Sequence, residues 1–225
     1  MTRNAMARLA GLLYLATVPT TGFAYGYVAF MPKDDPAALL AALEAGRPVL
    51  GWSVLLGAAG FVIYLLLAAL LHRLLAPAGK VLADLLVLFV TASVPLALAA
   101  LAQRMELMAL LDAGQLASDD AARLLRGETH LIQLATIFWG LWMMPLGWLS
   151  WRAGLVPKAI GIALIAGGFG YLTGFVFPVL GVDPPAAVGA ATMAVTLASE
   201  FAFMGWLIVR GAGRETSALH PAAGG

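Results

Sequence analysis

The sequence contains no cysteine, which excludes disulfide bonds, thiolate metal ligands and cysteine nucleophiles. Charge is also scarce, because only 11% of the 225 residues are Asp, Glu, Lys or Arg, a share well below that of soluble domains. The 13 basic and 12 acidic residues leave a formal net charge of +1, so no basic field would attract nucleic acid. Soluble and nucleic-acid-binding classes are therefore not expected.

Motifs for nucleotide binding and hydrolysis are missing as well. Gly79 and Lys80 are followed by Val81 and have no glycine loop before them, so the chain lacks a phosphate-binding loop for ATP. Neither an H-E-x-x-H zinc motif nor a G-x-S-x-G nucleophile elbow occurs. We expect no nucleotide, no cofactor and no metal, and an enzyme is less favoured than a non-catalytic protein.

Long hydrophobic runs fill most of the chain, in which 62% of residues are hydrophobic. A membrane-spanning helix needs about 20 mostly apolar residues. The first run is longer than the apolar core of a signal peptide and has no clean cleavage site, so we expect a retained helix. An all-α, polytopic membrane bundle is predicted within residues 1–211, with a flexible cytoplasmic tail at 212–225. Its six helices are expected at 9–30, 49–71, 81–102, 131–151, 159–180 and 187–209.

The distribution of basic residues predicts the orientation, because cytoplasmic segments are richer in Lys and Arg. With the N-terminus inside, eight basic residues lie inside: Arg3, Arg8, Arg73, Lys80, Arg152, Lys158, Arg210 and Arg214. Five then lie outside: Lys33, Arg47, Arg104, Arg123 and Arg126. Both termini are therefore predicted to be cytoplasmic.

Two connecting segments have the pattern of short helices outside the membrane. Residues 31–48 hold a run from Pro36 to Glu44 that Asp34 and Asp35 would cap and Gly46 would end. In residues 103–128, Ser118 would cap a second short helix that ends at Gly127.

Small and aromatic residues indicate how the helices pack. The Gly22-x-x-x-Gly26 and Gly170-x-x-x-Gly174 spacings allow close contact between helices. Trp139 and Trp142 lie deep in the fourth predicted helix, and we expect both to pack against the glycine-rich fifth helix.

Motifs rich in glycine and aromatic residues occur in the fourth and fifth predicted helices and in the turn between them. They are Phe138-Trp139-Gly140-Leu141, Gly147-Trp148-Leu149, Gly154-Leu-Val-Pro157-Lys158-Ala-Ile-Gly161 and Gly168-Phe-Gly170-Tyr171. Ala10-Gly11-Leu-Leu-Tyr14-Leu15 precedes them, and Glu200 with Trp206-Leu207 and Gly211 follows. This set resembles the bacterial domain-of-unknown-function 4386 family. The resemblance implies a multi-pass protein of the bacterial inner membrane, and it implies no reaction.

Glu200 is the most informative single residue, because it lies near the middle of the sixth predicted helix. An ionised carboxylate there costs several kcal/mol, roughly, unless it is paired or faces water. The nearest basic residue on the same helix is Arg210, about 15 Å away along the axis. We expect a carboxyl that is largely protonated at neutral pH and hydrogen-bonded to a hydroxyl or carbonyl near Pro19, Pro95 or Pro145.

A second group of polar residues lies where the third and fourth predicted helices meet the outer surface. Its charged or titratable members are Arg104, Glu106, Glu128 and His130, and they are candidates for a charge-selective entrance. Ordinary ion pairing at the interface explains the same residues. His130 has no histidine at a similar depth to share a metal or haem.

Two function classes remain open. One is a small proton-linked carrier or channel-like protein that uses Glu200, with the outer polar group as its vestibule. The other is a non-catalytic accessory or assembly subunit that contacts other membrane proteins, or another copy of itself, within the lipid bilayer.

The predicted topology can be tested with reporter fusions placed after Arg214 and near Gly114. We expect cytoplasmic reporter activity for the first fusion and periplasmic activity for the second. A periplasmic C-terminus would contradict the six-helix topology.

Overall fold

The computed structural model describes residues 1–32 and 35–212, and this part of the chain contains helices and no strand. Lys33, Asp34, Arg214 and the predicted tail from residue 213 onward lie outside the described residues. The helices are α1 (Arg3–Ala29), α2 (Pro36–Ala45), α3 (Arg47–Leu75), the 3-10 turn η1 (Ala76–Ala78), α4 (Lys80–Asp112), α5 (Ser118–Arg152), α6 (Lys158–Val179) and α7 (Ala186–Arg210).

Five helices, α3 to α7, are long and apolar enough to cross a membrane, as expected of a multi-pass membrane protein. The remaining predicted span, the first one at 9–30, corresponds to α1, which is 27 residues long but does not reach the same apolarity. Three threonines and Pro19 interrupt the apolar sequence of α1 and account for the difference.

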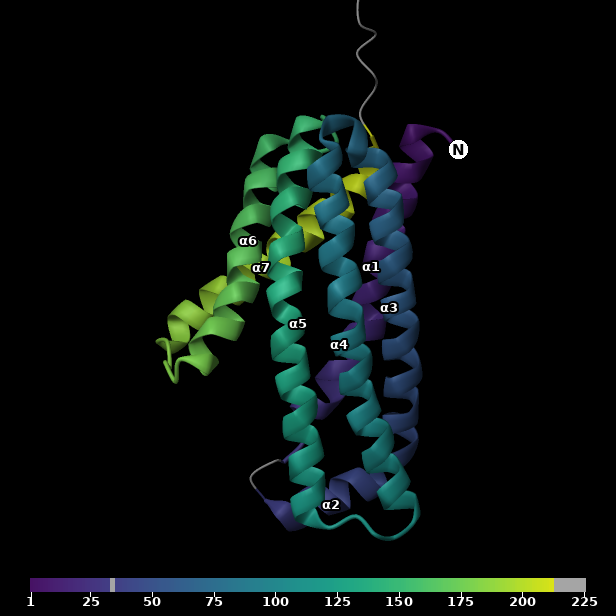
Figure 1. Ribbon diagram of the computed structural model, residues 1–225, viewed down its shortest axis with the longest axis vertical. Helices are drawn as coiled ribbons and strands as arrows, with labels where there is room; N and C mark the ends of the chain where they lie inside the picture. Colours follow the sequence, from purple (N-terminus) through teal and green to yellow (C-terminus); the bar gives the residue numbers. More distant parts are fainter. Residues whose placement is uncertain (33–34, 213–225) are drawn as a thin grey trace, which may run out of the picture.

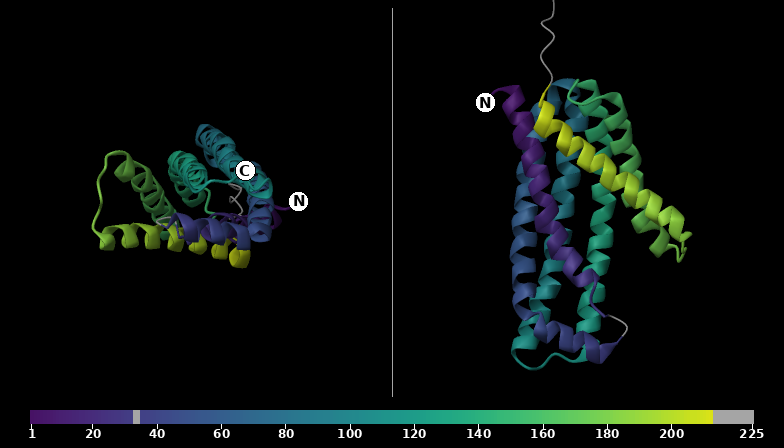
Figure 2. Two further views of the ribbon diagram at one scale, coloured as in Figure 1. Left: turned by 90° about the horizontal axis from the view of Figure 1, so that it is seen from below. Right: turned by 180° about the vertical axis from the view of Figure 1, so that it is seen from behind.

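The six long helices form a closed ring, because each packs against its neighbours in the chain and α7 packs back against α1. Figures 1 and 2 show α1, α3, α4 and α5 running along the long axis, with α7 crossing them obliquely. The short α2 lies across the end opposite the N-terminus. Asp35 caps α2 as predicted, since its carboxylate accepts hydrogen bonds from the backbone N–H of Ala37 and Ala38 at 3.0 and 3.1 Å.

The prediction of a separate short helix after Ser118 is wrong. Ser118 is the first residue of α5 and makes no cap, and the helix continues through Gly127 for 35 residues. Likewise α4 continues past its predicted end to Asp112. Leu124 and Leu125 pack into an apolar cluster with Leu39 and Leu43 of α2, so tertiary contacts stabilise the extended turns.

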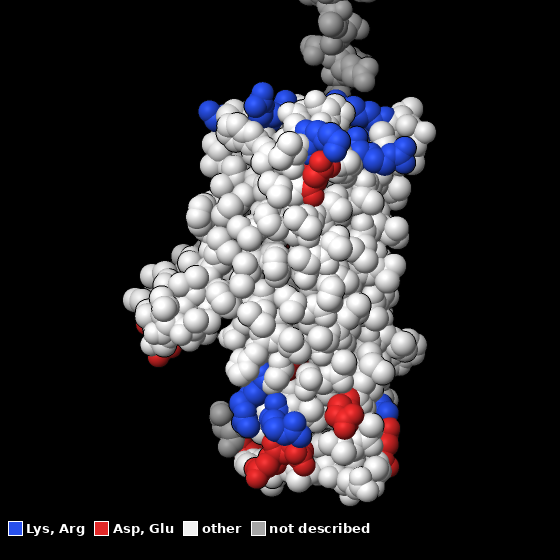
Figure 3. All heavy atoms as spheres, viewed as in Figure 1, with Lys and Arg blue, Asp and Glu red and all other residues white. Residues whose placement is uncertain are grey.

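The ends of α4 and α5 reach beyond the part of the molecule that matches a bilayer. Figure 3 shows an uncharged band between two charged zones, with Lys and Arg gathered at the end that holds the N-terminus. A helix of 33 residues such as α4 is about 50 Å long, whereas the hydrocarbon core is about 30 Å thick. The lower ends of α3, α4 and α5, together with α2, therefore form a cap beyond the uncharged band.

Aromatic side chains fill the centre of the ring. Trp142 is 1% exposed and packs edge-on against Tyr14 of α1 and Tyr64 of α3, with ring centroids 5.6 and 5.1 Å apart. The aromatic contacts of Trp142 are thus with α1 and α3, while its expected contact with the fifth predicted helix stays a prediction. Trp139 does pack there, against Tyr171 of α6 at 6.0 Å.

Glycines set the distance between α5 and α6. A Cβ built on Gly147 would lie 2.4 Å from the carbonyl oxygen of Gly161, and one built on Gly161 would lie 2.7 Å from that of Gly147. Gly140 and Gly168 approach each other in the same reciprocal way, each Cβ lying 2.6 Å from the opposite carbonyl oxygen. These contacts are backbone against backbone, so the two helices cannot tolerate a side chain at these positions without moving apart.

The two Gly-x-x-x-Gly motifs of the sequence, on α1 and α6, differ in their surroundings. Gly170 packs closely against Thr196 of α7, whereas Gly22, Gly26 and Gly174 have nothing near their Cβ positions. The Gly22-x-x-x-Gly26 pair therefore makes no close helix contact among the residues that the structure describes.

Gly147→Ala should lower the free energy of unfolding by about 1–3 kcal/mol, because the new methyl group collides with the backbone of α6. Gly22→Ala is the matched control, and it should leave stability unchanged or raise it by less than about 1 kcal/mol. Unfolding in mixed micelles measures both. Equal effects of the two variants would contradict the backbone contact between α5 and α6.

Candidate functional site

Glu200 lies on α7 beside the face that packs into the bundle. Thr196, Ser199 and Phe203 form that buried face. Glu200 comes directly after Ser199 in the chain and is partly buried. The carboxyl is thus at the edge of the core, in contact with the neighbouring helices and not fully enclosed by them.

Two tyrosine hydroxyls hold the carboxyl group. The hydroxyl of Tyr14 on α1 donates to Oε1 of Glu200 at 2.5 Å, and the hydroxyl of Tyr171 on α6 donates to Oε2 at 3.2 Å. No Lys or Arg of the described residues forms an ion pair with Glu200. The carboxyl therefore joins α1, α6 and α7 through neutral partners, which we call the Tyr–Glu–Tyr site.

The sequence predicted a hydroxyl or a carbonyl near Pro19, Pro95 or Pro145 as the partner of Glu200. Both partners are hydroxyls, but only Tyr14 lies on a helix that contains one of these prolines. Tyr14 precedes Pro19 by five residues, whereas Tyr171 belongs to α6. Both tyrosine rings are fixed by aromatic neighbours. Tyr14 packs edge-on against Trp142 and Phe203, and Tyr171 packs edge-on against Trp139.

The Tyr–Glu–Tyr site fits both protonation states of Glu200. When the carboxyl is ionised, both hydroxyls can donate to it, one to each oxygen. When it is protonated, its own O–H can donate to one tyrosine oxygen while the other tyrosine still donates to the carbonyl oxygen. Rotation of hydroxyl groups is then enough to keep every group bonded as a proton is bound or released.

The site lies where the α6–α7 hairpin leaves the bundle. None of the described residues from Phe169 to Val195 is buried, although burial resumes at Thr196. Figures 1 and 2 show this half of the hairpin diverging from the other helices. Tyr171 and Glu200 therefore lie at the base of the diverging segment.

A second polar site lies deep between four helices. Arg104 on α4 is 0% exposed and forms a buried ion pair with Glu128 on α5. Its Nε donates to Oε2 of Glu128 at 3.2 Å, and its Nη1 donates to the carbonyl of Ala24 at 2.6 Å and to Oγ of Ser53 at 2.7 Å. These groups come from α1, α3, α4 and α5, and we call them the arginine site.

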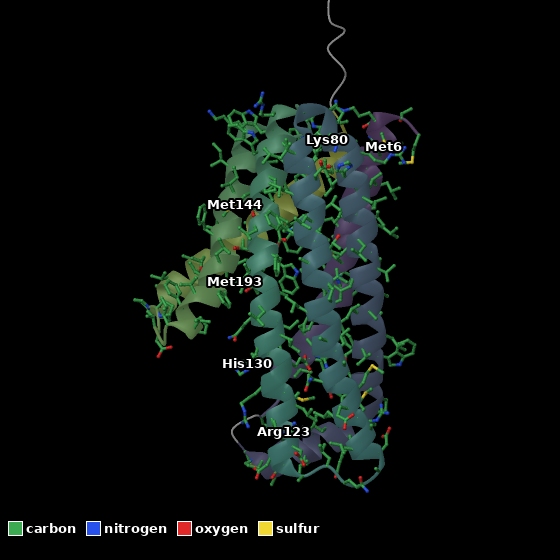
Figure 4. The ribbon with its side chains drawn as sticks, in the orientation of Figure 1. Met6, Lys80, Arg123, His130, Met144 and Met193 are labelled. Carbon is green, nitrogen blue, oxygen red and sulfur yellow. The ribbon has the colours of Figure 1, made fainter. Side chains whose placement is uncertain are left out.

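Of the five candidate residues, the structure brings together only Arg104 and Glu128. Glu106 and His130 are exposed and form no ion pair within the described part of the chain. Figure 4 shows His130 on the side of α5 that faces away from the bundle. The polar group therefore does not converge on a common outer opening, and its central pair is enclosed by helices.

Sequence reasoning missed Tyr14 and Tyr171 as partners of Glu200. A signal was present, because all three residues lie in the motifs that carry the family resemblance. Tyr14 belongs to the first motif, Tyr171 ends the Gly168-Phe-Gly170-Tyr171 motif, and Glu200 belongs to the last. Ser53 and the carbonyl of Ala24 lie in no such motif and gave no comparable signal.

The comparison with protein families identifies the chain. A family model described as a domain of unknown function (DUF4386) matches residues 9–211, which include both polar sites. The chain belongs to the DUF4386 family. No curated protein and no solved structure matches it. Family membership confirms the resemblance seen in the motifs and leaves the activity to be argued from the two polar sites.

Glu200→Gln should keep the free energy of unfolding within about 1 kcal/mol of the wild type, because an amide can replace the carboxyl toward both tyrosines. Glu200→Leu should lower it by about 1–3 kcal/mol, because the buried Tyr14 hydroxyl loses its partner. Unfolding in mixed micelles measures both, with Glu106→Leu at an exposed position as the control.

The same variants test the predicted protonation of Glu200. In infrared difference spectra of the wild type against Glu200→Gln, we expect the band of a protonated carboxyl at neutral pH. A carboxylate band already present at mildly acidic pH would show that Glu200 is ionised. A Glu200→Leu variant as stable as the wild type would show that the tyrosines do not depend on the carboxyl.

Proposed function

We propose that this protein is a small proton-linked carrier or channel-like protein of the bacterial inner membrane, in which Glu200 binds the proton. One observation carries the proposal: a carboxyl on a helix long and apolar enough to cross a membrane has a tyrosine hydroxyl at each oxygen, and no cation of the described residues is paired with it. Carboxyl groups within membrane-spanning segments are rare and commonly belong to proton relays. The Tyr–Glu–Tyr site provides for both protonation states, as a proton-binding group requires.

Proton binding at Glu200 would act on the contact between α7 and α1. In the ionised form both tyrosines donate, and in the protonated form one of these bonds must reverse its direction. The site lies at the base of the diverging α6–α7 hairpin, so a change in these bonds acts where the hairpin meets the bundle. This position supports coupling between protonation and the angle of the hairpin.

A row of polar groups on α1 supports a route between the two polar sites. Thr17 donates to the carbonyl of Tyr14 at 2.6 Å, and Thr21 donates to the carbonyl of Thr17 at 2.7 Å. Ala24, whose carbonyl accepts from Arg104, follows on the same face at helical spacing. Hydroxyls and carbonyls thus extend along α1 from Glu200 toward the arginine site.

The distribution of charge supports the proposed orientation, with six spans and both termini in the cytoplasm. In Figure 3 the end of the molecule that holds the N-terminus carries mostly Lys and Arg, whereas both signs of charge are present at the opposite end. Cytoplasmic ends of membrane helices carry the excess of basic residues.

A second candidate function is the accessory or assembly subunit. It is favoured by the α6–α7 hairpin, in which no described residue from Phe169 to Val195 is buried. Exposed apolar side chains such as Val188 and Met193 lie on this segment and could contact another membrane protein.

Proton flux into vesicles distinguishes the two functions. Purified protein is reconstituted with an entrapped pH-sensitive dye, and a potassium gradient with valinomycin sets the membrane potential. We expect proton entry faster than in protein-free vesicles, with Glu200→Gln reducing the rate to that of protein-free vesicles. Glu106→Gln, the same change at an exposed position, should keep the wild-type rate.

Tyr14→Phe removes one hydroxyl while leaving the aromatic packing, and its rate should fall between those of the wild type and Glu200→Gln. A wild-type rate equal to that of protein-free vesicles, or an unchanged rate in Glu200→Gln, would overturn the proton-linked function. Recovery of the chain in a stoichiometric complex would then support the accessory role.

A further inference from the structure

A pocket of about 650 Å³ opens at the basic end of the molecule, beyond the Tyr–Glu–Tyr site toward the C-terminal end of α7. It is lined by Asn4 at the start of α1, by Trp206 and Arg210 at the end of α7 with Ala212 after it, and by residues 154–157. The pocket therefore lies where the first helix, the last helix and the turn between α5 and α6 meet.

Arginine side chains lie at or near this pocket. Arg210 lines it directly, and Arg3 donates to the carbonyl of Ala153, next to the lining residue Gly154, at 2.7 Å. The side chain of Arg8 packs beside Gly211, which directly follows Arg210. Among the described residues none of these arginines forms an ion pair with a carboxylate.

Trp206 fixes one wall of the pocket. Its Nε1 donates to the carbonyl of Leu155 at 3.1 Å, and the guanidinium of Arg210 lies 5.7 Å from the centre of its ring. Tryptophan with its N–H bonded and its ring exposed to apolar surroundings is typical of the boundary between bilayer and water. The pocket is thus placed at the depth of lipid head groups.

We propose that this pocket binds the head group of an anionic phospholipid. A lipid phosphate supplies a negative charge that Arg210 in the lining and Arg3 beside it can pair with, and a guanidinium binds phosphate oxygens through two parallel N–H donors. Basic pockets between membrane helices recognise such head groups. Trp206 in the lining favours a lipid phosphate over free phosphate, because tryptophan is typical of the boundary between bilayer and water.

The test uses the full chain in mild detergent and brominated phosphatidylglycerol, which quenches tryptophan fluorescence. Trp206→Phe identifies the part of the quenching that comes from the pocket. We expect saturable quenching of Trp206, and Arg210→Gln should weaken it about fivefold or more, the loss expected for one basic contact. Brominated phosphatidylcholine, which carries no net charge, should quench Trp206 much more weakly.

Arg152→Gln is the matched control, because Arg152 lies on the same end of the molecule but contacts Trp148 and does not line the pocket. It should change the affinity less than twofold, and circular dichroism confirms that both variants are folded. Equal losses in Arg152→Gln and Arg210→Gln would show general attraction to a basic surface and overturn the proposal. Equal quenching by phosphatidylcholine, or displacement of the lipid by millimolar inorganic phosphate, would overturn it as well.

Discussion

The buried ion pair between Arg104 and Glu128 fixes where four of the long helices meet. A charged pair inside a protein is stable only when further hydrogen bonds satisfy the groups that its partners leave free. Here the carbonyl of Ala24 and the hydroxyl of Ser53 complete the shell of the guanidinium. Removing any one of these groups leaves a buried donor or acceptor without a partner. One side chain, that of Arg104, therefore joins α1, α3, α4 and α5 at this level of the bundle.

The two polar sites hold the bundle in different ways. The arginine site joins charged groups and is enclosed on all sides, since Arg104 is fully buried. The Tyr–Glu–Tyr site joins one titratable group to two neutral hydroxyls and remains partly exposed. The first suits a fixed joint between helices, and the second suits a contact that changes with protonation. Because α1 contributes to both, it connects the fixed part of the bundle to the part that carries the hairpin.

Apolar length and charge placement made the helical spans predictable, because the cost of burying polar groups in lipid acts on each segment separately. The ends of α4 and α5 were not predictable in this way. Arg104 lies just after an apolar run and resembles an interfacial residue until Glu128, 24 positions later, is placed beside it. Gly127 looks like a helix end but continues α5, because packing against α2 decides its conformation.

The candidate site was half visible in the sequence. Glu200 was found because a single carboxyl in an apolar helix is costly wherever the rest of the chain lies. Its partners could not be derived from that cost, since Tyr14 is 186 residues away along the chain and Tyr171 is 29 residues away. Only the family motifs linked the three residues, and motifs give no distances. The exact glycine contacts between α5 and α6 likewise depend on how two helices cross, which local sequence does not specify.

The helices of the ring differ in length, and this has a consequence for the surrounding lipid. α6 and α7 have 22 and 25 residues, whereas α4 and α5 have 33 and 35. A short helix adapts to a thicker or thinner bilayer by tilting, at a cost of only fractions of a kcal/mol, roughly, per ångström of mismatch. The long helices are held by the cap and by the arginine site, so the tilt falls on the hairpin. Bilayer thickness therefore acts on the angle at which α7 meets α1, and through it on the geometry around Glu200.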